Sequence, residues 1–102
     1  MTREENLLVT LMEECAEVQQ NVSKALRFGL GGHHPDAPEE TNERSILTEY
    51  YQLVATMEML LSDGYLKNLP VEEERRIKYD KKTKIRQYQE IAKELGLIKK
   101  ED

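Results

Sequence analysis

The stretch REENLLVTLMEECAEVQQNVSKALR, residues 3–27, contains neither glycine nor proline. Its apolar residues recur every three or four positions, the period that predicts an amphipathic helix. Advancing each residue by about 100° places polar side chains directly beside the apolar arc, so that acids lie at the edge of the predicted core face. The arc consists of Leu7, Leu11, Cys15, Val18, Val22 and Ala25, and the bordering polar residues are Glu14, Glu17, Asn21 and Lys24.

A loop and a second helix follow this stretch. Residues 29–40, GLGGHHPDAPEE, hold three of the five glycines and two of the three prolines, which predicts a loop. The helical period returns over residues 42–61 and stops before Gly64. Glu49 and Gln52, one turn apart, lie beside the apolar arc of this second helix.

A third helix is predicted over residues 71–95. Pro70 precedes three consecutive glutamates, a pattern typical of a helix start, and Gly96 suits the position just after a helix end. The pair Tyr79-Asp80 leaves a break within this helix open. No alternating strand pattern occurs, so the predicted fold class is all-α, an antiparallel helical bundle in one domain of residues 1–102.

The composition limits the function classes. A chain of 102 residues buries only roughly two-thirds of its unfolded surface as a monomer, so we expect a homodimer or homotetramer to complete the bundle. The net charge of -5 argues against a nucleic-acid partner. No apolar run approaches the roughly 20 residues of a membrane span, which argues against a membrane partner. Glu4 and Glu5 stand where a signal peptide would be basic, so we expect a cytoplasmic protein.

Packing the first two helices along their apolar arcs brings acids on the two flanks together. Carboxylates that face each other at a core edge repel and lose hydration unless a cation compensates them. An oxygen-only set of ligands suits Mg²⁺ or Mn²⁺, and Mg²⁺ shares its remaining positions with water and substrate phosphates. The predicted metal ligands are Glu14, Glu17, Glu49 and Gln52.

Two segments carry a resemblance to a known family: EECAEVQQNVSKALRFG, residues 13–29, and LTEYYQLVATMEML, residues 47–60. Over roughly residues 5–61 the chain resembles the all-α nucleoside triphosphate pyrophosphohydrolases of the MazG-like superfamily, most closely the small single-domain members of bacteriophages. The family pattern for Mg²⁺ ligation is Glu-Glu-x-x-Glu on one helix and Glu-x-x-Asp on the next. This chain has glutamates at 13, 14, 17 and 49, but Gln52 stands in place of the aspartate.

The resemblance implies hydrolysis of a ribo- or deoxynucleoside triphosphate to the monophosphate and pyrophosphate, in a homodimer or homotetramer that controls a nucleotide pool. A phage-encoded member would act in the host cytoplasm. Glu13, Glu14, Glu17 and Glu49 would be catalytic, with Glu13 ligating metal or orienting the attacking water. The neutral amide of Gln52 weakens the expected cage, which leaves a nucleotide-binding sensor and a structural helical dimer as alternatives.

Other residues are candidates for contact with the substrate. Basic residues beyond the acids of the first helix suit phosphate oxygens, or else the dipole at the helix end. Two lysines and a tyrosine share a face of the third helix and, by resemblance, would clamp the substrate. In the alternative interpretation, the alkyl chains of the lysines cover apolar surface while their ammonium groups stay in water. The candidates for phosphate contact are Lys24, Arg27, Lys81 and Lys84, and those for the rest of the substrate are Asn21 and Tyr88. Adjacent His33 and His34 lack the further ligands of a metal pair.

Overall fold

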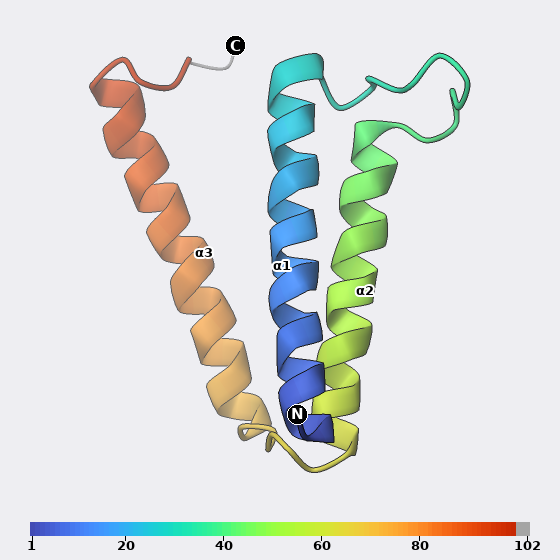
Figure 1. The fold of residues 1–102 in the computed structure, drawn as a ribbon. Helices are drawn as coiled ribbons and strands as arrows, with labels where there is room; N and C mark the ends of the chain where they lie inside the picture. Colours follow the sequence, from blue (N-terminus) through green and yellow to red (C-terminus); the bar gives the residue numbers. More distant parts are fainter. Residues whose placement is uncertain (100–102) are drawn as a thin grey trace. The chain divides into compact units, whose positions relative to one another are not determined.

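The computed structural model describes residues 1–99, which form three helices and no strand: α1 (Arg3–Phe28), α2 (Asn42–Ser62) and α3 (Val71–Glu94) (Figure 1). This confirms the all-α fold class, and every helix end lies within one residue of its predicted position. Helix α3 is continuous across Tyr79 and Asp80, so the break left open there does not occur.

Local side-chain chemistry explains where α1 and α2 begin and where α1 ends. Thr2 caps α1 in a capping box, because its hydroxyl accepts from the Glu5 backbone N–H and the Glu5 carboxylate accepts from the Thr2 backbone N–H. Thr41 caps α2 by accepting from the Arg44 backbone N–H at 3.2 Å. Gly29 ends α1 with a φ of 89°, a conformation that a side chain would strain.

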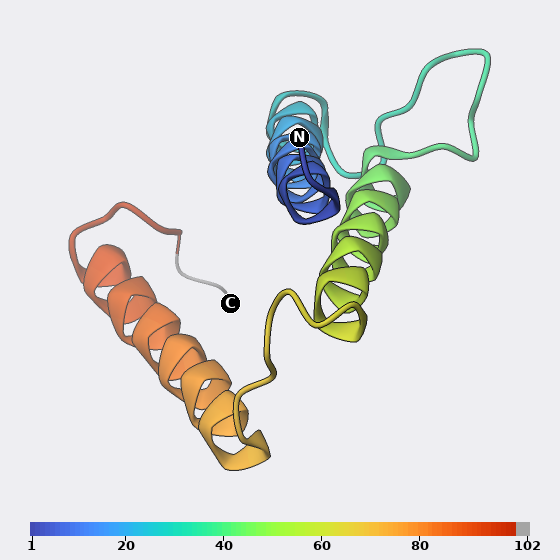
Figure 2. The same cartoon turned by 60° about the horizontal axis from the view of Figure 1, so that its bottom comes forward.

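The chain divides into two compact units, one of residues Met1–Lys67 and one that begins at Asn68 and contains α3. In the first unit α1 and α2 lie side by side and run antiparallel, and the loop of residues 29–41 connects their neighbouring ends (Figures 1 and 2). We call this first pair of helices with its loop the hairpin. The assignment of residues 1–102 to a single domain stays a prediction.

The two hairpin helices meet along a seam of positions spaced alternately three and four apart, the spacing that keeps one stripe of each helix facing the other. Its members are half-buried, except that Thr56 and Leu60 are buried, the two buried residues among 1–99. The seam consists of Leu7, Leu11, Glu14, Val18, Asn21 and Ala25 on α1 and of Asn42, Ile46, Glu49, Leu53, Thr56 and Leu60 on α2.

The seam corrects one sequence-based expectation. Cys15 and Val22 were predicted in the core arc of the first helix with Glu14 and Asn21 only bordering it, but Cys15 and Val22 are exposed and Glu14 and Asn21 are half-buried. The reason is geometric. A single partner helix covers only one row of residues with a period of 3.5, and on α1 this row includes the polar positions 14 and 21. Polar groups therefore lie inside the helix contact.

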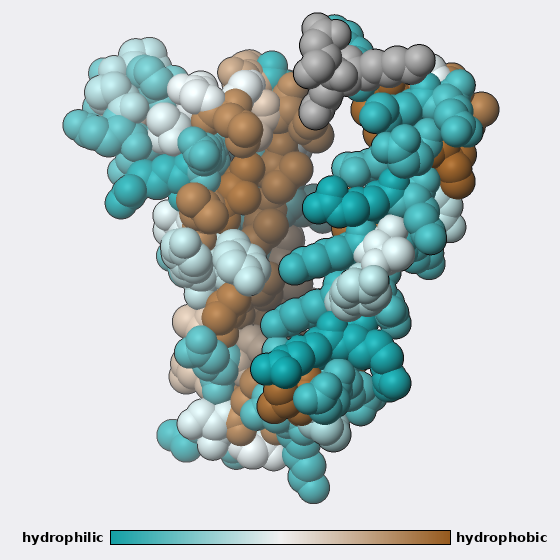
Figure 3. Space-filling model, turned by 180° about the vertical axis from the view of Figure 1, so that it is seen from behind, coloured by the Kyte–Doolittle hydropathy of each residue, from teal (hydrophilic) through white to brown (hydrophobic). Residues whose placement is uncertain are grey.

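Many apolar side chains outside the seam are exposed. They gather in a band along the hairpin (Figure 3), and a hollow of about 410 Å³ on α1 is lined only by Leu8, Val9, Leu11, Met12 and Cys15. The exposed apolar residues of α2 include Leu47, Tyr50, Tyr51 and Met59. Within residues 1–99 no helix combines the length and apolar character needed to cross a membrane.

Candidate metal centre

Three glutamates converge in the middle of the hairpin. Glu14 and Glu17 lie one turn apart on α1, and Glu49 lies on α2; one carboxylate oxygen from each lies within 4.8 Å of the others. Glu14 and Glu49 are half-buried because they belong to the seam, and Glu17 is exposed beside it. The structure thus brings together three of the four residues predicted as metal ligands. We call them the carboxylate triad.

Two oxygens of the triad lack partners. Glu14 Oε2 and Glu49 Oε2 are shielded from solvent, and neither has a hydrogen-bond partner among the described residues. A buried carboxylate oxygen without a partner is costly, because it has lost hydration and gained nothing in return. Since both orphaned oxygens belong to the same cluster, a single bound cation is able to satisfy both.

Electrostatics within the triad point the same way. A side-chain hydrogen bond with Glu17 raises the pKa of Glu49 from 4.5 to about 7, and partial burial and the Glu14 carboxyl push in the same direction. Every cause of the shift disfavours a third negative charge at this place. The triad is therefore short of positive charge, which either a proton or a cation supplies.

The donor set fits a hard divalent cation. All three side chains offer carboxylate oxygens and no histidine or cysteine belongs to the cluster, which suits Mg²⁺ or Mn²⁺ over zinc. A cation held by three protein carboxylates keeps positions for water or phosphate oxygens.

Glu13 and Gln52, the remaining residues of the predicted metal and catalytic set, lie outside the cluster of three. Glu13 is exposed on α1, next to Glu14. Gln52 is exposed one turn beyond Glu49, and its backbone oxygen accepts a hydrogen bond from the Thr56 hydroxyl at 3.0 Å. Their roles toward metal and water stay predictions.

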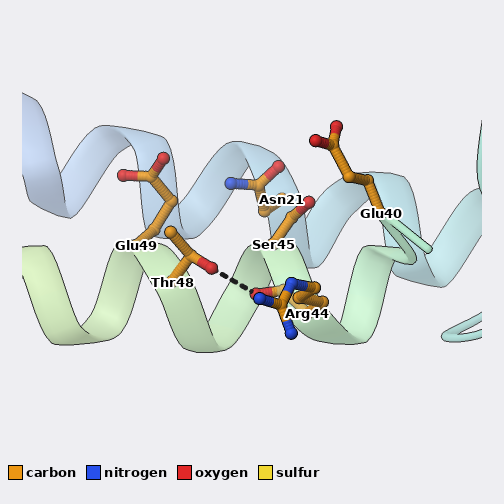
Figure 4. Close-up of a pocket in the computed structure, with 6 residues that line it drawn as sticks. All are labelled: Asn21, Glu40, Arg44, Ser45, Thr48 and Glu49. Carbon is orange, nitrogen blue, oxygen red and sulfur yellow. Dashed lines mark hydrogen bonds between the residues drawn. The ribbon is translucent and has the colours of Figure 1, made fainter. Parts of the chain in front are cut away.

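A hollow of about 400 Å³ adjoins the triad at Glu49. In Figure 4, side chains from α2 line it together with Asn21 from α1 and Glu40 from the end of the loop. Asn21 was predicted to contact substrate, and its position next to the triad is compatible with that role. The α2 residues are Arg44, Ser45, Thr48 and Glu49.

Four residues that line this hollow were not predicted from the sequence: Glu40, Arg44, Ser45 and Thr48. Arg44 lines the same hollow as Glu49, and the Thr48 hydroxyl donates to the Arg44 backbone oxygen at 2.8 Å. Their spacing was a usable pattern, because positions 44, 45, 48 and 49 of one helix share a flank. A basic residue five positions before a predicted metal ligand is thus a candidate for phosphate contact.

A second hollow, of about 440 Å³, continues the first toward the loop and shares Asn21, Glu40 and Ser45 with it. Lys24, a predicted phosphate contact, lies in this second hollow. It is completed by Phe28, His33, His34, Pro35 and Asn42.

The other predicted substrate contacts lie elsewhere. Arg27 does not line either hollow; its guanidinium carbon lies 5.4 Å from the centroid of the Phe28 ring. Lys84 and Tyr88 pair on α3, with the ammonium nitrogen 6.0 Å from the ring centroid, and Lys81 is exposed on the same helix. Their contacts with substrate stay predictions.

Comparison of the chain with models of known protein families, with curated protein sequences and with solved structures gives no match. The resemblance to the MazG-like superfamily therefore stays a prediction, carried by the spacing of the glutamates.

Proposed function

We propose that this protein is a Mg²⁺-dependent nucleoside triphosphate pyrophosphohydrolase, with Mn²⁺ as an alternative cation. The observation that carries the proposal is the pair of shielded, unpartnered oxygens, Glu14 Oε2 and Glu49 Oε2, within one cluster of three carboxylates. If the seam served only to hold the two helices together, apolar residues at these positions would stabilise the helix contact better than three carboxylates do.

The triad would hold the cation through Glu14, Glu17 and Glu49, and the amide oxygen of Gln52 would add or replace a ligand. When bound, a divalent cation lowers the pKa of water and offsets negative charge on phosphates. Glu13, exposed beside the triad, would ligate or orient the attacking water. Water attacks the α-phosphorus, the bond from that phosphorus to the bridging oxygen breaks, and the products are the monophosphate and pyrophosphate.

Basic residues would hold the phosphate oxygens that the cation does not reach. Arg44 is best supported, because it lines the same hollow as Glu49, and Lys24 lies in the adjoining one. Arg27, Lys81 and Lys84 retain the phosphate role assigned to them from the sequence.

We further propose that the protein acts as a homodimer or homotetramer in the cytoplasm, where it controls a nucleotide pool. The support for assembly is the uncovered apolar surface of the hairpin. Met12 is 67% exposed and Tyr51 is 62% exposed, although both belong to the helices that form the seam. Covering such surface stabilises a helical pair that is too small to bury it alone.

One alternative function has an observation in its favour. Gln52 contributes no negative charge where the family pattern has aspartate, so a protein that binds nucleotides without turning them over fits the same hollows. The change Gln52→Asp separates the two. An increase of an existing activity means that the glutamine tunes an enzyme, whereas activity that appears only in the variant favours the binding module.

The direct test is pyrophosphate release from a panel of ribo- and deoxynucleoside triphosphates, each with Mg²⁺, Mn²⁺ or a chelator. Products are separated so that monophosphate is distinguished from diphosphate. We expect metal-dependent monophosphate and pyrophosphate from a subset of bases. Folded protein that releases no pyrophosphate under any condition contradicts the proposal.

A further inference from the structure

The hollow at the loop end of the hairpin has the lining of a site for a flat, partly polar group. Phe28 contributes an aromatic ring that is 67% exposed, Pro35 a second apolar surface, and His33 and His34 two planar polar rings. The hollow also adjoins the one that Glu49 lines, through three shared residues. A molecule that spans both reaches from the carboxylate triad to these rings.

The loop that carries the two histidines is tied to both helices. The Asn42 side chain donates to the Gly29 backbone oxygen and the Asn42 backbone N–H donates to the Gly32 oxygen, each at 2.9 Å. Gly32 approaches so closely that an added Cβ would lie 2.8 Å from the Phe28 oxygen. Gly32, the residue before the two histidines, is thus packed against the end of α1. This contact fixes the point from which the loop crosses the hollow.

Backbone contacts also select a tautomer for the neutral form of each imidazole ring. His33 Nδ1 lies 2.9 Å from the His34 backbone oxygen, which only accepts, so this nitrogen carries the proton and Nε2 is left as an acceptor. His34 Nδ1 accepts from the Asp36 backbone N–H at 3.2 Å, so its Nε2 carries the proton and donates. The pair therefore offers one acceptor and one donor.

The spacing along α1 suits a nucleotide. Asn21 lies one turn beyond Glu17, Lys24 almost one further turn, and Phe28 about 16 Å beyond Glu17 at 1.5 Å per residue. A phosphate group at the triad therefore leaves room for a sugar beside Asn21 and a base beyond it.

We propose that this hollow binds the nucleobase of a nucleoside triphosphate, with the base against the Phe28 ring and its polar edge at His33 and His34. The Watson–Crick edge of every nucleobase places a donor beside an acceptor, in one order for adenine and cytosine and in the reverse order for guanine and thymine. The histidine pair, with one donor and one acceptor, therefore both fits such an edge and distinguishes between the two orders. Stacking of the base on the Phe28 ring contributes affinity for the nucleotide, and this contribution depends little on which base is bound. The inference rests on the proposed function, because it places the phosphates of the same molecule at the triad.

The test is calorimetric titration in Mg²⁺ with nucleotide analogues whose α,β-bridging oxygen is replaced by a methylene group, so that no turnover occurs. Inorganic tripolyphosphate is the base-free probe. We expect the wild type to bind at least one analogue more tightly than tripolyphosphate. Phe28→Ala should weaken that analogue about tenfold and leave tripolyphosphate unchanged. Since Phe28 is largely exposed, its truncation leaves the seam intact.

The matched control is Leu30→Ala, which shortens an exposed apolar residue of the same loop outside the hollow. We expect it to change neither affinity, whereas the double variant His33→Ala and His34→Ala should narrow the differences among the four bases. The inference is overturned if Phe28→Ala weakens both probes equally or neither, or if no analogue binds more tightly than tripolyphosphate. Absence of hydrolysis in protein that shows base-dependent binding contradicts the proposed activity instead and leaves this site standing.

Discussion

Glu49 in the hairpin and Glu74 in α3 are both helical glutamates, yet their surroundings shift their pKa values in opposite directions. A hydrogen bond from Lys78, 2.8 Å away, lowers the pKa of Glu74, whereas a hydrogen bond with Glu17 raises the pKa of Glu49 to about 7. Glu74 has its compensating charge one turn away on the same helix. Glu49 faces only further acids within its cluster.

The same contrast holds for the whole segments. Residues 1–67 contain 12 acidic and 5 basic residues, whereas residues 68–102 contain 8 acidic and 10 basic ones. The ion pairs Glu72–Arg75, Glu74–Lys78 and Glu90–Lys93 follow the surface of α3 at three- and four-residue spacings. Three acids on α3 thus have a basic partner on their own helix, whereas the triad acids in the hairpin meet only one another within their cluster.

The largest expected effect is on catalysis. Glu49→Gln removes a predicted metal ligand and keeps the shape of the side chain, so we expect pyrophosphate release to fall by more than about 100-fold. Glu58→Gln is the matched control, because it makes the same change at an exposed position of α2. Equal turnover in the two variants would remove the triad from the mechanism.

The next effect is stabilisation by the cation itself. Excess Mg²⁺ should raise the Tm of the wild type by several degrees, because it binds the folded triad and not the unfolded chain. The rise should disappear in Glu17→Gln and persist in Glu74→Gln. Thermal unfolding followed by circular dichroism measures this, and a rise of the same size in all three proteins would indicate a nonspecific salt effect.

A smaller effect concerns the pH dependence of the metal-free protein. The folded pKa of Glu49, about 7, lies above its value of 4.5 in the unfolded chain, so the folded state binds this proton more tightly. The resulting stability is complete below pH 4.5 and is lost as the pH rises through about 7. In chelator, the Tm should therefore fall between about pH 5 and pH 8, and Glu49→Gln should reduce the fall. A wild-type Tm that matches the variant at every pH contradicts the shift.

Glu74 should show the opposite and weakest dependence. Because the pKa of Glu74 is lowered in the folded state, the ionised carboxylate stabilises the fold at pH values above its pKa in the unfolded chain. This contribution is lost as the pH falls through the pKa in the folded state. The pair with Lys78 is solvated, so Glu74→Gln should lower the Tm at neutral pH by at most about 3 °C. A larger loss would mean that α3 depends on this pair for more than helix stability.

The helix ends were predictable because local residues determine them. Thr2 with Glu5, Gly29 and Pro70 each act within one turn of the chain, and the bounds follow to within one residue. The convergence of Glu14, Glu17 and Glu49 was also predictable, since both helices carry their acids on matching flanks. Periodicity did not determine which row of α1 residues contacts α2, because that depends on how many partners cover the helix. For this reason Cys15 and Val22 were wrongly predicted to lie in the core.

The hollows beyond the triad were not predictable. The loop of residues 29–41 has no period, so its path over Lys24 and Phe28 follows from contacts such as Asn42 with Gly29 that pattern reasoning does not reach. Arg44 was not predicted for a different reason, because it lies away from the apolar arc of the second helix that Glu49 and Gln52 border.

The central claim, that the triad binds a divalent cation, is tested most directly by titrating Mn²⁺ into the wild type, Glu49→Gln and Glu58→Gln and following the electron paramagnetic resonance signal of free Mn²⁺. We expect the signal to be suppressed by the wild type and by Glu58→Gln, restored by competing Mg²⁺, and barely affected by Glu49→Gln. Mn²⁺ that stays free in the presence of folded wild-type protein, or that binds Glu49→Gln equally well, contradicts the claim.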